Sequence, residues 1–500
     1  MMGIDALPCE VEVDVSTGGL EKTVIVGLPD TAVKESIERV RSAVFNSGYP
    51  FPKTPSIVNL APADIRKEGP SFDLPIAVGM LAGQGVFASE RQEQCVMAGE
   101  LALDGRVRPV KGALSMALMA RKQGFKVLLA PVENAREAAV VQDIQVIPVA
   151  SLTEAVGYLT GELPLEPTQL DLEDMFSHGA HYDVDFADVK GQEQVKRALT
   201  VAAAGGHNLL LIGPPGTGKT MLTKRLPTIL PPLTLEESLE TTRVHSALGL
   251  LDSERPLLAV RPVRSPHHSA SGPSLVGGGA IPKPGELSLA HNGLLFLDEF
   301  PEFSRVVLET IRQPLEDHQV TIARAAGTLT FPARIMLVAA MNPCLCGYLT
   351  DPKRKCKCTP NQVQAYLSKL SGPLVDRIDI HVEVPAVPFE QLRSEREGTD
   401  SATLREQVMI ARKRQVLRFD DLNVRTNSEM SSRQVREYCK LDEEGQQILK
   451  QSVYELGLSA RAHDKVLKVA RTLADMELAE VISPHHLAEA IQYRRLDRNL

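Results

Sequence analysis

The chain has 500 residues, of which 43% are hydrophobic, so it can form two to four domains with sizeable cores. A net charge of −8, no Trp and 4% aromatic residues exclude a wholly basic nucleic-acid domain and an obvious base-stacking platform, but not local basic loops. No apolar run reaches the about 20 residues that span a bilayer, and residues 1–5 lack the features of a signal peptide, so we expect a cytoplasmic protein with no membrane partner and few disulfides.

Two segments of the N-terminal part resemble the Lon protease domain, which has an α+β fold of the ribosomal S5 type. They are residues 99–110 (GELALDGRVRPV) and 67–71 (KEGPS). The resemblance places Ser71 at the position of the nucleophile and Leu114 at the position of the lysine base. Because leucine cannot accept a proton, and Lys111 lies three residues away, we predict an inactive Lon-like domain that serves ring assembly and DNA contact.

The composition changes after residue 162. Residues 161–167 are rich in proline and residues 171–174 are acidic, as is typical of a linker between domains. Helical periodicity and the helix-start signal Ser483-Pro484 mark the last hundred residues. We therefore predict an α/β protein with four parts, which are an α+β Lon-like domain (1–162), a linker (163–188), a core with a parallel sheet (189–388) and a helical lid (389–500).

A glycine-rich segment in the core is the most informative feature of the sequence. Residues 213–220 fit the pattern G-x-x-x-x-G-K-[ST] without mismatch, between a predicted strand (208–212) and a predicted helix (221–226), which disfavours a chance glycine-rich turn. Backbone N–H groups of such a loop surround phosphate oxygens, the lysine reaches the β- and γ-phosphates, and the hydroxyl holds Mg²⁺. The predicted nucleotide-binding residues are Gly213, Pro214, Pro215, Gly216, Thr217, Gly218, Lys219 and Thr220.

Two insertions follow the glycine-rich segment. Residues 274–279 contain three consecutive glycines and predict a flexible loop. Residues 320–331 predict a β-hairpin, because two β-rich runs flank the sequence Arg324-Ala325-Ala326-Gly327. Each insertion is either an idle surface loop or a contact for a ligand.

Two carboxylates follow the next apolar run. Residues 293–297 predict a buried strand of a parallel sheet, and ligands bind at the carboxyl ends of such strands. Asp298 would hold Mg²⁺, and Glu299 would orient and deprotonate the attacking water. An isolated Asp-Glu pair more often marks a strand end that faces solvent, but the upstream phosphate loop favours the catalytic interpretation.

Three further polar residues fit the same chemistry. Asn342 ends another apolar run and would align the attacking water with Glu299. Arg377 stands among carboxylates, where it makes either a local salt bridge or an arginine finger that enters a neighbouring subunit's site. Arg461 opens a helix of the lid and would bring a further cation to the nucleotide, in its own subunit or across an interface.

Four of the seven cysteines follow the spacing C-x-C-x₉-C-x-C. Thiolates suit Zn²⁺, and a four-cysteine site closes a loop that has little core of its own. The basic residues between the two pairs favour thiolate forms. The C-x-C spacing is tighter than the usual C-x₂-C, so reduced thiols on a surface loop are the alternative to the structural Zn²⁺ site that we predict at Cys344, Cys346, Cys356 and Cys358.

Residues 185–500 resemble AAA+ ATPases of the magnesium-chelatase and MCM-helicase branch, and nearly the whole chain is similar to the YifB/ComM family of magnesium-chelatase-like competence proteins. Besides the phosphate loop, the segments that carry the resemblance are LDEF (297–300), MNP (341–343), LVDRID (374–379), RSPHHSAS (264–271) and NPCLCG (342–347).

The resemblance implies a homo-hexameric ATPase that uses ATP and Mg²⁺ and acts on DNA. It implies helicase or branch-migration activity in homologous recombination during natural transformation, with both insertions pointing into the central pore and Arg324 contacting phosphates. Two alternatives stay open, a magnesium-chelatase motor subunit and an ATP-dependent Lon-like protease. The N-terminal domain and the cysteine loop disfavour the first alternative, and Leu114 disfavours the second.

Overall fold

The computed structural model describes the chain except for residues 173–174, 177–181, 253, 280–281, 325–326, 352, 393–397, 421–423, 457–458, 495 and 497–500. The described residues form two compact units. Unit 1 contains Met1–Gly179 and Leu235–Ala259, and unit 2 contains Ala180–Thr234 and Val260–Leu500. The four-part division predicted from the sequence remains a prediction.

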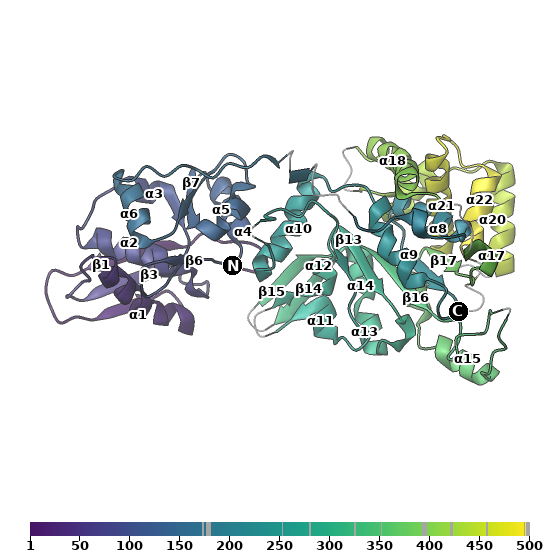
Figure 1. The fold of residues 1–500 in the computed structure, drawn as a ribbon, viewed down its shortest axis with the longest axis horizontal. Helices are drawn as coiled ribbons and strands as arrows, with labels where there is room; N and C mark the ends of the chain where they lie inside the picture. Colours follow the sequence, from purple (N-terminus) through teal and green to yellow (C-terminus); the bar gives the residue numbers. More distant parts are fainter. Residues whose placement is uncertain are drawn as a thin grey trace. The chain divides into compact units, whose positions relative to one another are not determined.

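Unit 1 contains two three-stranded sheets and a two-stranded hairpin (Figure 1). Their strand orders are β1-β3-β2, β4-β7-β8 and β5-β6. In β3, buried positions alternate with more exposed ones, so one face of the sheet packs on the core. The strands are β1 (Glu10–Val15), β2 (Thr23–Val26), β3 (Ser56–Ala61), β4 (Cys95–Met97), β5 (Glu100–Leu101), β6 (Val107–Arg108), β7 (Val127–Pro131) and β8 (Gln145–Val149).

The helices of unit 1 pack around these sheets, and one of them comes from the inserted segment Leu235–Ala259. They are α1 (Thr31–Asn46), α2 (Asp73–Gly83), α3 (Arg91–Gln94), α4 (Ala113–Lys122), α5 (Val132–Ala139), α6 (Leu152–Thr160) and α10 (Leu235–Leu248). A buried carboxylate at the start of α2 ties several elements together. Asp73 accepts hydrogen bonds from Ser36 Oγ, from Arg39 Nε at 2.8 Å and from Leu101 N at 3.2 Å, so its burial is compensated.

Unit 2 is built on a five-stranded parallel sheet of order β10-β13-β16-β9-β17. Strands β9 and β13 are buried at every position, as expected of a parallel sheet covered on both faces. The strands are β9 (Leu209–Ile212), β10 (Val263–Arg264), β13 (Gly293–Leu297), β16 (Ile335–Met341) and β17 (Ile380–Glu383). Together with the helical C-terminal region, this sheet confirms the predicted α/β fold class.

The helices of unit 2 cover the sheet and form the C-terminal region, where Figure 1 shows α20, α21 and α22 side by side. The longer ones are α8 (Glu193–Gly205), α9 (Lys219–Arg225), α15 (Pro360–Leu367), α18 (Ser401–Arg418), α19 (Ser432–Tyr438), α20 (Glu443–Leu456), α21 (Ala460–Met476) and α22 (Pro484–Gln492). The shorter ones are α11 (Gly272–Val276), α12 (Glu286–Leu289), α13 (Arg305–Thr310), α14 (Arg312–Asp317), α16 (Gly372–Val375) and α17 (Phe389–Leu392).

A buried ion pair joins the C-terminal helices to the sheet. Lys465 Nζ of α21 lies 2.6 Å from Asp379 Oδ1, next to β17, and Asn208 N donates to Asp379 Oδ2 at 2.9 Å. Burial opposes the charged carboxylate, but Lys465 and His207 outweigh burial and hold the pKa of Asp379 well below its usual value. The pair therefore fixes α21 against the sheet at a defined register.

The two insertions are ordered where the structure describes them. Residues 272–278, which include much of the predicted flexible loop, form α11 and the strand β11 (Gly277–Gly278), which pairs with β12 (Lys283–Pro284). The predicted hairpin is confirmed as β14 (Gln319–Arg324) paired antiparallel with β15 (Gly327–Pro332). Its small tip, residues 325–326, lies outside the described residues. In the part of the chain that the structure covers, no helix is long and apolar enough to cross a membrane.

Candidate active site

The phosphate loop connects the buried strand β9 to α9, as its sequence predicts. Gly216 and Gly218 have φ angles of 78° and 89°, which glycine adopts without a steric cost. A Cβ on Gly213 would lie 2.3 Å from Val384 O, so the backbones approach too closely for any other residue. Thr217 is buried, and its hydroxyl donates to Pro214 O at 3.0 Å. A glycine-rich loop between a strand and a helix can direct its backbone N–H groups toward an anion.

Lys219 lies inside this loop. Its Nζ donates to Gly213 O at 2.6 Å, to Pro214 O at 2.9 Å and to Asn342 Oδ1 at 3.2 Å. Burial lowers the pKa of Lys219, and Asp298 partly opposes this effect. The ammonium group thus connects the end of β9 to the end of β16, where Asn342 stands.

The end of β13 supplies the carboxylate predicted for Mg²⁺. Thr220 Oγ1 donates to Asp298 Oδ2 at 2.7 Å, and the other carboxylate oxygen of Asp298 accepts from Glu299 N at 2.9 Å. A hydroxyl and a carboxylate at this distance are hard oxygen ligands that suit Mg²⁺. Thr220 and Asp298 would therefore hold Mg²⁺, which would supply positive charge beside a bound phosphate.

Glu299 follows Asp298 in a left-handed conformation, with φ 51°, and its side chain is 59% exposed. His268 Nδ1 lies 3.0 Å from Glu299 Oε2. Sequence analysis identified the segment around His268 as a family hallmark but assigned it no chemical role. The sequence carries no local signal for this contact, because it depends on the position of β10 beside β13 in the sheet.

Arg377 and Arg461 converge on one carboxylate rather than on the phosphate loop. Arg377 is 9% exposed, donates to Arg312 O at 3.1 Å and Pro373 O at 2.6 Å, and its Nη2 lies 2.8 Å from Glu316 Oε1. Arg461 is more exposed and lies 3.8 Å from the same Glu316 oxygen. Among the contacts described within the chain, neither arginine touches residues 213–220. A role in a neighbouring subunit's site stays a prediction.

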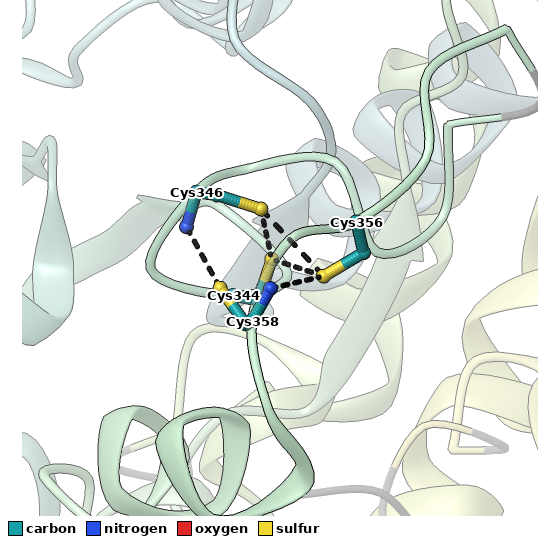
Figure 2. A group of neighbouring side chains, drawn as sticks. All are labelled: Cys344, Cys346, Cys356 and Cys358. Carbon is teal, nitrogen blue, oxygen red and sulfur yellow. Dashed lines mark hydrogen bonds between the residues drawn. The ribbon is translucent and has the colours of Figure 1, made fainter.

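The four cysteines of the predicted zinc site converge (Figure 2). The Sγ–Sγ distances are 3.5 Å for Cys344–Cys346, 3.7 Å for Cys344–Cys356 and 3.6 Å for Cys346–Cys356. Four sulfurs at about 2.3 Å from a tetrahedral Zn²⁺ lie about 3.8 Å from one another. A disulfide needs about 2.05 Å, so this arrangement fits a shared metal ion and not paired cystines.

Backbone amides complete the surroundings of the thiols. Cys346 N donates to Cys358 Sγ at 3.3 Å, and Cys358 N donates to Cys356 Sγ at 3.4 Å. The backbone N–H groups of Lys357 and Tyr348 lower the pKa of Cys346 to about 6. Backbone N–H groups also act to lower the pKa values of Cys356 and Cys358, but burial and the neighbouring thiols of the cluster outweigh them, raising the pKa of Cys356 to about 12 and also raising the pKa of Cys358. Such N–H···S bonds orient metal-binding thiolates. The chemistry of this donor set therefore also fits Zn²⁺.

The cysteine loop contacts the phosphate loop, and the helix that follows it contacts the end of β16. A Cβ on Gly347 would lie 2.7 Å from Pro215 Cδ, so the two turns are in direct contact. Tyr366, on the helix after Cys358, is buried and hydrogen bonds to the backbone of Asn342, and burial raises its pKa to about 12. The cysteine loop therefore supports both the phosphate loop and the end of β16.

In unit 1, the position predicted for a Lon-type lysine is part of an apolar core. The Leu114 side chain is fully buried in a cluster that includes Leu128 and Leu257. Glu137 Oε1 accepts a hydrogen bond from Leu114 N at 3.0 Å. The aliphatic part of Lys111 lies against Gly249, since a Cβ there would be 3.2 Å from Lys111 Cε. The leucine at position 114 is therefore a packing residue of this core and cannot act as the base for Ser71.

Models of the magnesium chelatase family match most of the chain. The model described as magnesium chelatase, subunit ChlI, matches residues 185–392. A second model, subunit ChlI of Mg-chelatase, matches residues 11–134, and a third, the C-terminal part of subunit ChlI, matches residues 398–494.

Two relatives are similar over their full length. The chain is 46% identical over 500 residues to the uncharacterized protein YifB of Salmonella typhimurium. This alignment covers 100% of the chain and 96% of the relative. The chain is also 44% identical over 504 residues to the competence protein ComM of Haemophilus influenzae. This alignment covers 100% of the chain and 97% of the relative.

Two weaker similarities are partial. The probable DNA helicase MCM9 of Arabidopsis thaliana is 25% identical over 277 residues, which cover 54% of this chain and 36% of the relative. The Lon protease of Rhizobium meliloti is 28% identical over 166 residues, which cover 31% of this chain and 20% of the relative.

The site geometry yields a first prediction. We expect Glu299→Gln to bind ATP normally but to hydrolyse it about 10²–10⁴-fold more slowly, because a positioned base contributes that factor. Lys219→Ala should lose nucleotide binding as well. Binding of a fluorescent ATP analogue and steady-state phosphate release measure the two effects separately. Near-normal turnover by Glu299→Gln would show that another residue activates the water.

Proposed function

We propose, from the premise that this chain belongs to the magnesium-chelatase-like family of YifB and ComM, that it is a ring-forming motor that uses ATP hydrolysis to move DNA strands. Membership of this family makes it an ATPase of the ComM and YifB type, with ATP and Mg²⁺ as cofactors. Its finer activity would be helicase action or branch migration in homologous recombination during natural transformation.

The observation that supports the ATPase part is the convergence of three strand ends on one loop. Lys219 would reach the β- and γ-phosphates, and Thr220 and Asp298 would hold Mg²⁺, which neutralises charge on the phosphate oxygens when bound. Glu299 would take a proton from the attacking water, and Asn342 would orient that water from the adjacent strand. These residues come from three segments of the chain, which follow β9, β13 and β16, and the sheet positions them together.

The DNA part is supported by the names of two relatives and by one exposed arginine. One full-length relative is named a competence protein, and a partial relative is named a probable DNA helicase. The β14–β15 hairpin ends in the exposed Arg324, which suits contact with a phosphate backbone. A chelatase motor subunit is the second candidate, because the matching family models are those of magnesium chelatase.

A single comparison of ATPase rates distinguishes the candidates and gives the second prediction. We expect single-stranded or forked DNA to stimulate hydrolysis, whereas a magnesium-chelatase partner subunit and unfolded casein leave it unchanged. Stimulation by the chelatase partner alone would support the second candidate. Cleavage of casein by the wild type but not by Ser71→Ala would establish a protease. It would contradict the prediction that the domain is inactive because leucine stands at position 114.

The third prediction concerns the ring. If Arg377 serves a neighbouring subunit, the rate of hydrolysis per subunit should rise with protein concentration, because the site is complete only between subunits. Mixing Arg377→Ala with Glu299→Gln, each nearly inactive alone, should restore activity in mixed rings. Arg433→Ala, an exposed arginine outside the site, serves as the control. Normal hydrolysis by fully assembled Arg377→Ala would refute the finger.

The fourth prediction concerns the metal, since we propose that the four cysteines hold one structural Zn²⁺. Protein purified under reducing conditions without chelator should contain about one zinc per chain. Changing Cys356 and Cys358 to Ser should release it and expose the 344–358 loop to limited proteolysis at its lysines. Changing Cys9 and Cys95, which lie outside the cluster, should leave zinc bound. Wild-type protein that contains no zinc after this purification would refute the proposed zinc site.

A further inference from the structure

We propose that the loop closed by the four cysteines is a phosphate-binding surface for the DNA backbone, separate from the β14–β15 hairpin. The inference rests on the proposed DNA motor and names a second contact of that motor with its substrate. We call this surface the basic loop, and define it by its four cationic residues, Lys353, Arg354, Lys355 and Lys357.

The charge of the basic loop is opposite to that of the chain. The chain carries a net charge of −8, yet residues 343–367 contain these four cations and one carboxylate, Asp351, for a net charge of +3. Asp351 Oδ1 accepts from Lys353 N at 2.7 Å and from Arg354 N at 3.2 Å, so the carboxylate holds the backbone of the turn. Where the structure describes the chain, no ion pair involves the four cationic side chains.

The cysteine cluster directs the cations toward solvent. In residues 355–358 lysine and cysteine alternate, and the burial alternates with them, since Lys355 and Lys357 are exposed and Cys356 and Cys358 are half-buried. Successive side chains of an extended segment point to opposite sides. When the thiols hold a metal ion, the lysines are therefore fixed on the outer side of the loop, which lowers the entropy cost of binding a polyanion.

The neighbouring residues suit a phosphate backbone. Arg354 Nη1 donates to Tyr348 Oη at 2.8 Å, and the guanidinium lies 5.1 Å from the ring centroid, so this cation is oriented rather than free. On α15, which begins directly after the cluster, Asn361 and Gln364 are exposed and uncharged. Phosphate contacts are made by Lys and Arg together with amide and hydroxyl side chains, and they are independent of base sequence.

The competing explanation is local charge balance. Four thiolates and one Zn²⁺ carry a net charge of −2, and nearby lysines would stabilise that centre without touching DNA. The two explanations differ in what the lysines affect. A phosphate-binding surface affects the affinity for DNA and its salt dependence, whereas charge balance affects zinc retention.

The test uses the full chain with zinc bound and the triple variant Lys353→Gln, Lys355→Gln, Lys357→Gln. Fluorescence anisotropy with a labelled duplex and a labelled oligo-dT strand gives affinity as a function of salt. Each phosphate contact to duplex DNA adds about 0.9 to the slope of log K against log salt. Between about 50 and 200 mM salt the wild type should therefore lose about 40-fold more duplex affinity than the variant, if all three lysines make contacts.

A matched control removes the same charge from a mixed surface. Arg433, Arg436 and Lys440 are exposed on or next to α19, beside Glu437 and Asp442. Changing these three cations to Gln should leave the salt slope unchanged. ATPase activity without DNA and zinc content should equal those of the wild type in both variants, because none of the six residues contacts the nucleotide site or supplies a thiol.

Three outcomes decide the proposal. An unchanged salt slope in the lysine variant, with DNA-stimulated ATPase in the wild type, would overturn the basic loop and leave the proposed function standing. Loss of zinc by the variant would favour charge balance, and Lys353→Glu, whose lysine is not adjacent to a cysteine, must then still weaken DNA binding for the proposal to survive. A wild type that neither binds DNA nor responds to it would refute the proposed function itself.

Discussion

The parallel pairing of β9 with β16 and β17 is the constraint on which the site depends. Carboxyl ends of parallel strands lie at the same edge of a sheet, so the phosphate loop after β9 meets Asn342 after β16. The next strand, β13, brings Asp298 to the Thr220 hydroxyl. The strand order thus places Lys219, Asp298 and Asn342 at one edge of the sheet, where Glu299 takes a left-handed backbone conformation.

The cysteine loop extends this constraint beyond the sheet. Its first cysteine follows Asn342 by two residues, Gly347 contacts Pro215, and Tyr366 at its far end returns to the Asn342 backbone. A segment with little hydrophobic core of its own is thus anchored on the nucleotide site at both ends. The four cationic side chains of the basic loop are exposed on its outer side. One short segment therefore contacts the phosphate loop and also presents a cationic surface to solvent.

The arginines and the N-terminal unit show how context decides the role of a residue. Within the chain, Glu316 binds both Arg377 and Arg461, so either arginine must leave this carboxylate before it can reach another site. In unit 1, the Lon-like pattern survives around Ser71, while Leu114 is packed in the core against residues of the segment Leu235–Ala259. Leu114 therefore contributes to packing and cannot act as a base.

The sequence by itself determined the strand–loop–helix unit at 213–220, the carboxylates after residue 297, the hairpin and the cysteine pattern, because local spacing encodes each of them. Tertiary structure alone decided that His268 meets Glu299, that one carboxylate holds two arginines, and that Leu235–Ala259 packs with the first unit. These contacts depend on strand order and on packing between segments far apart in the chain, which no local periodicity records.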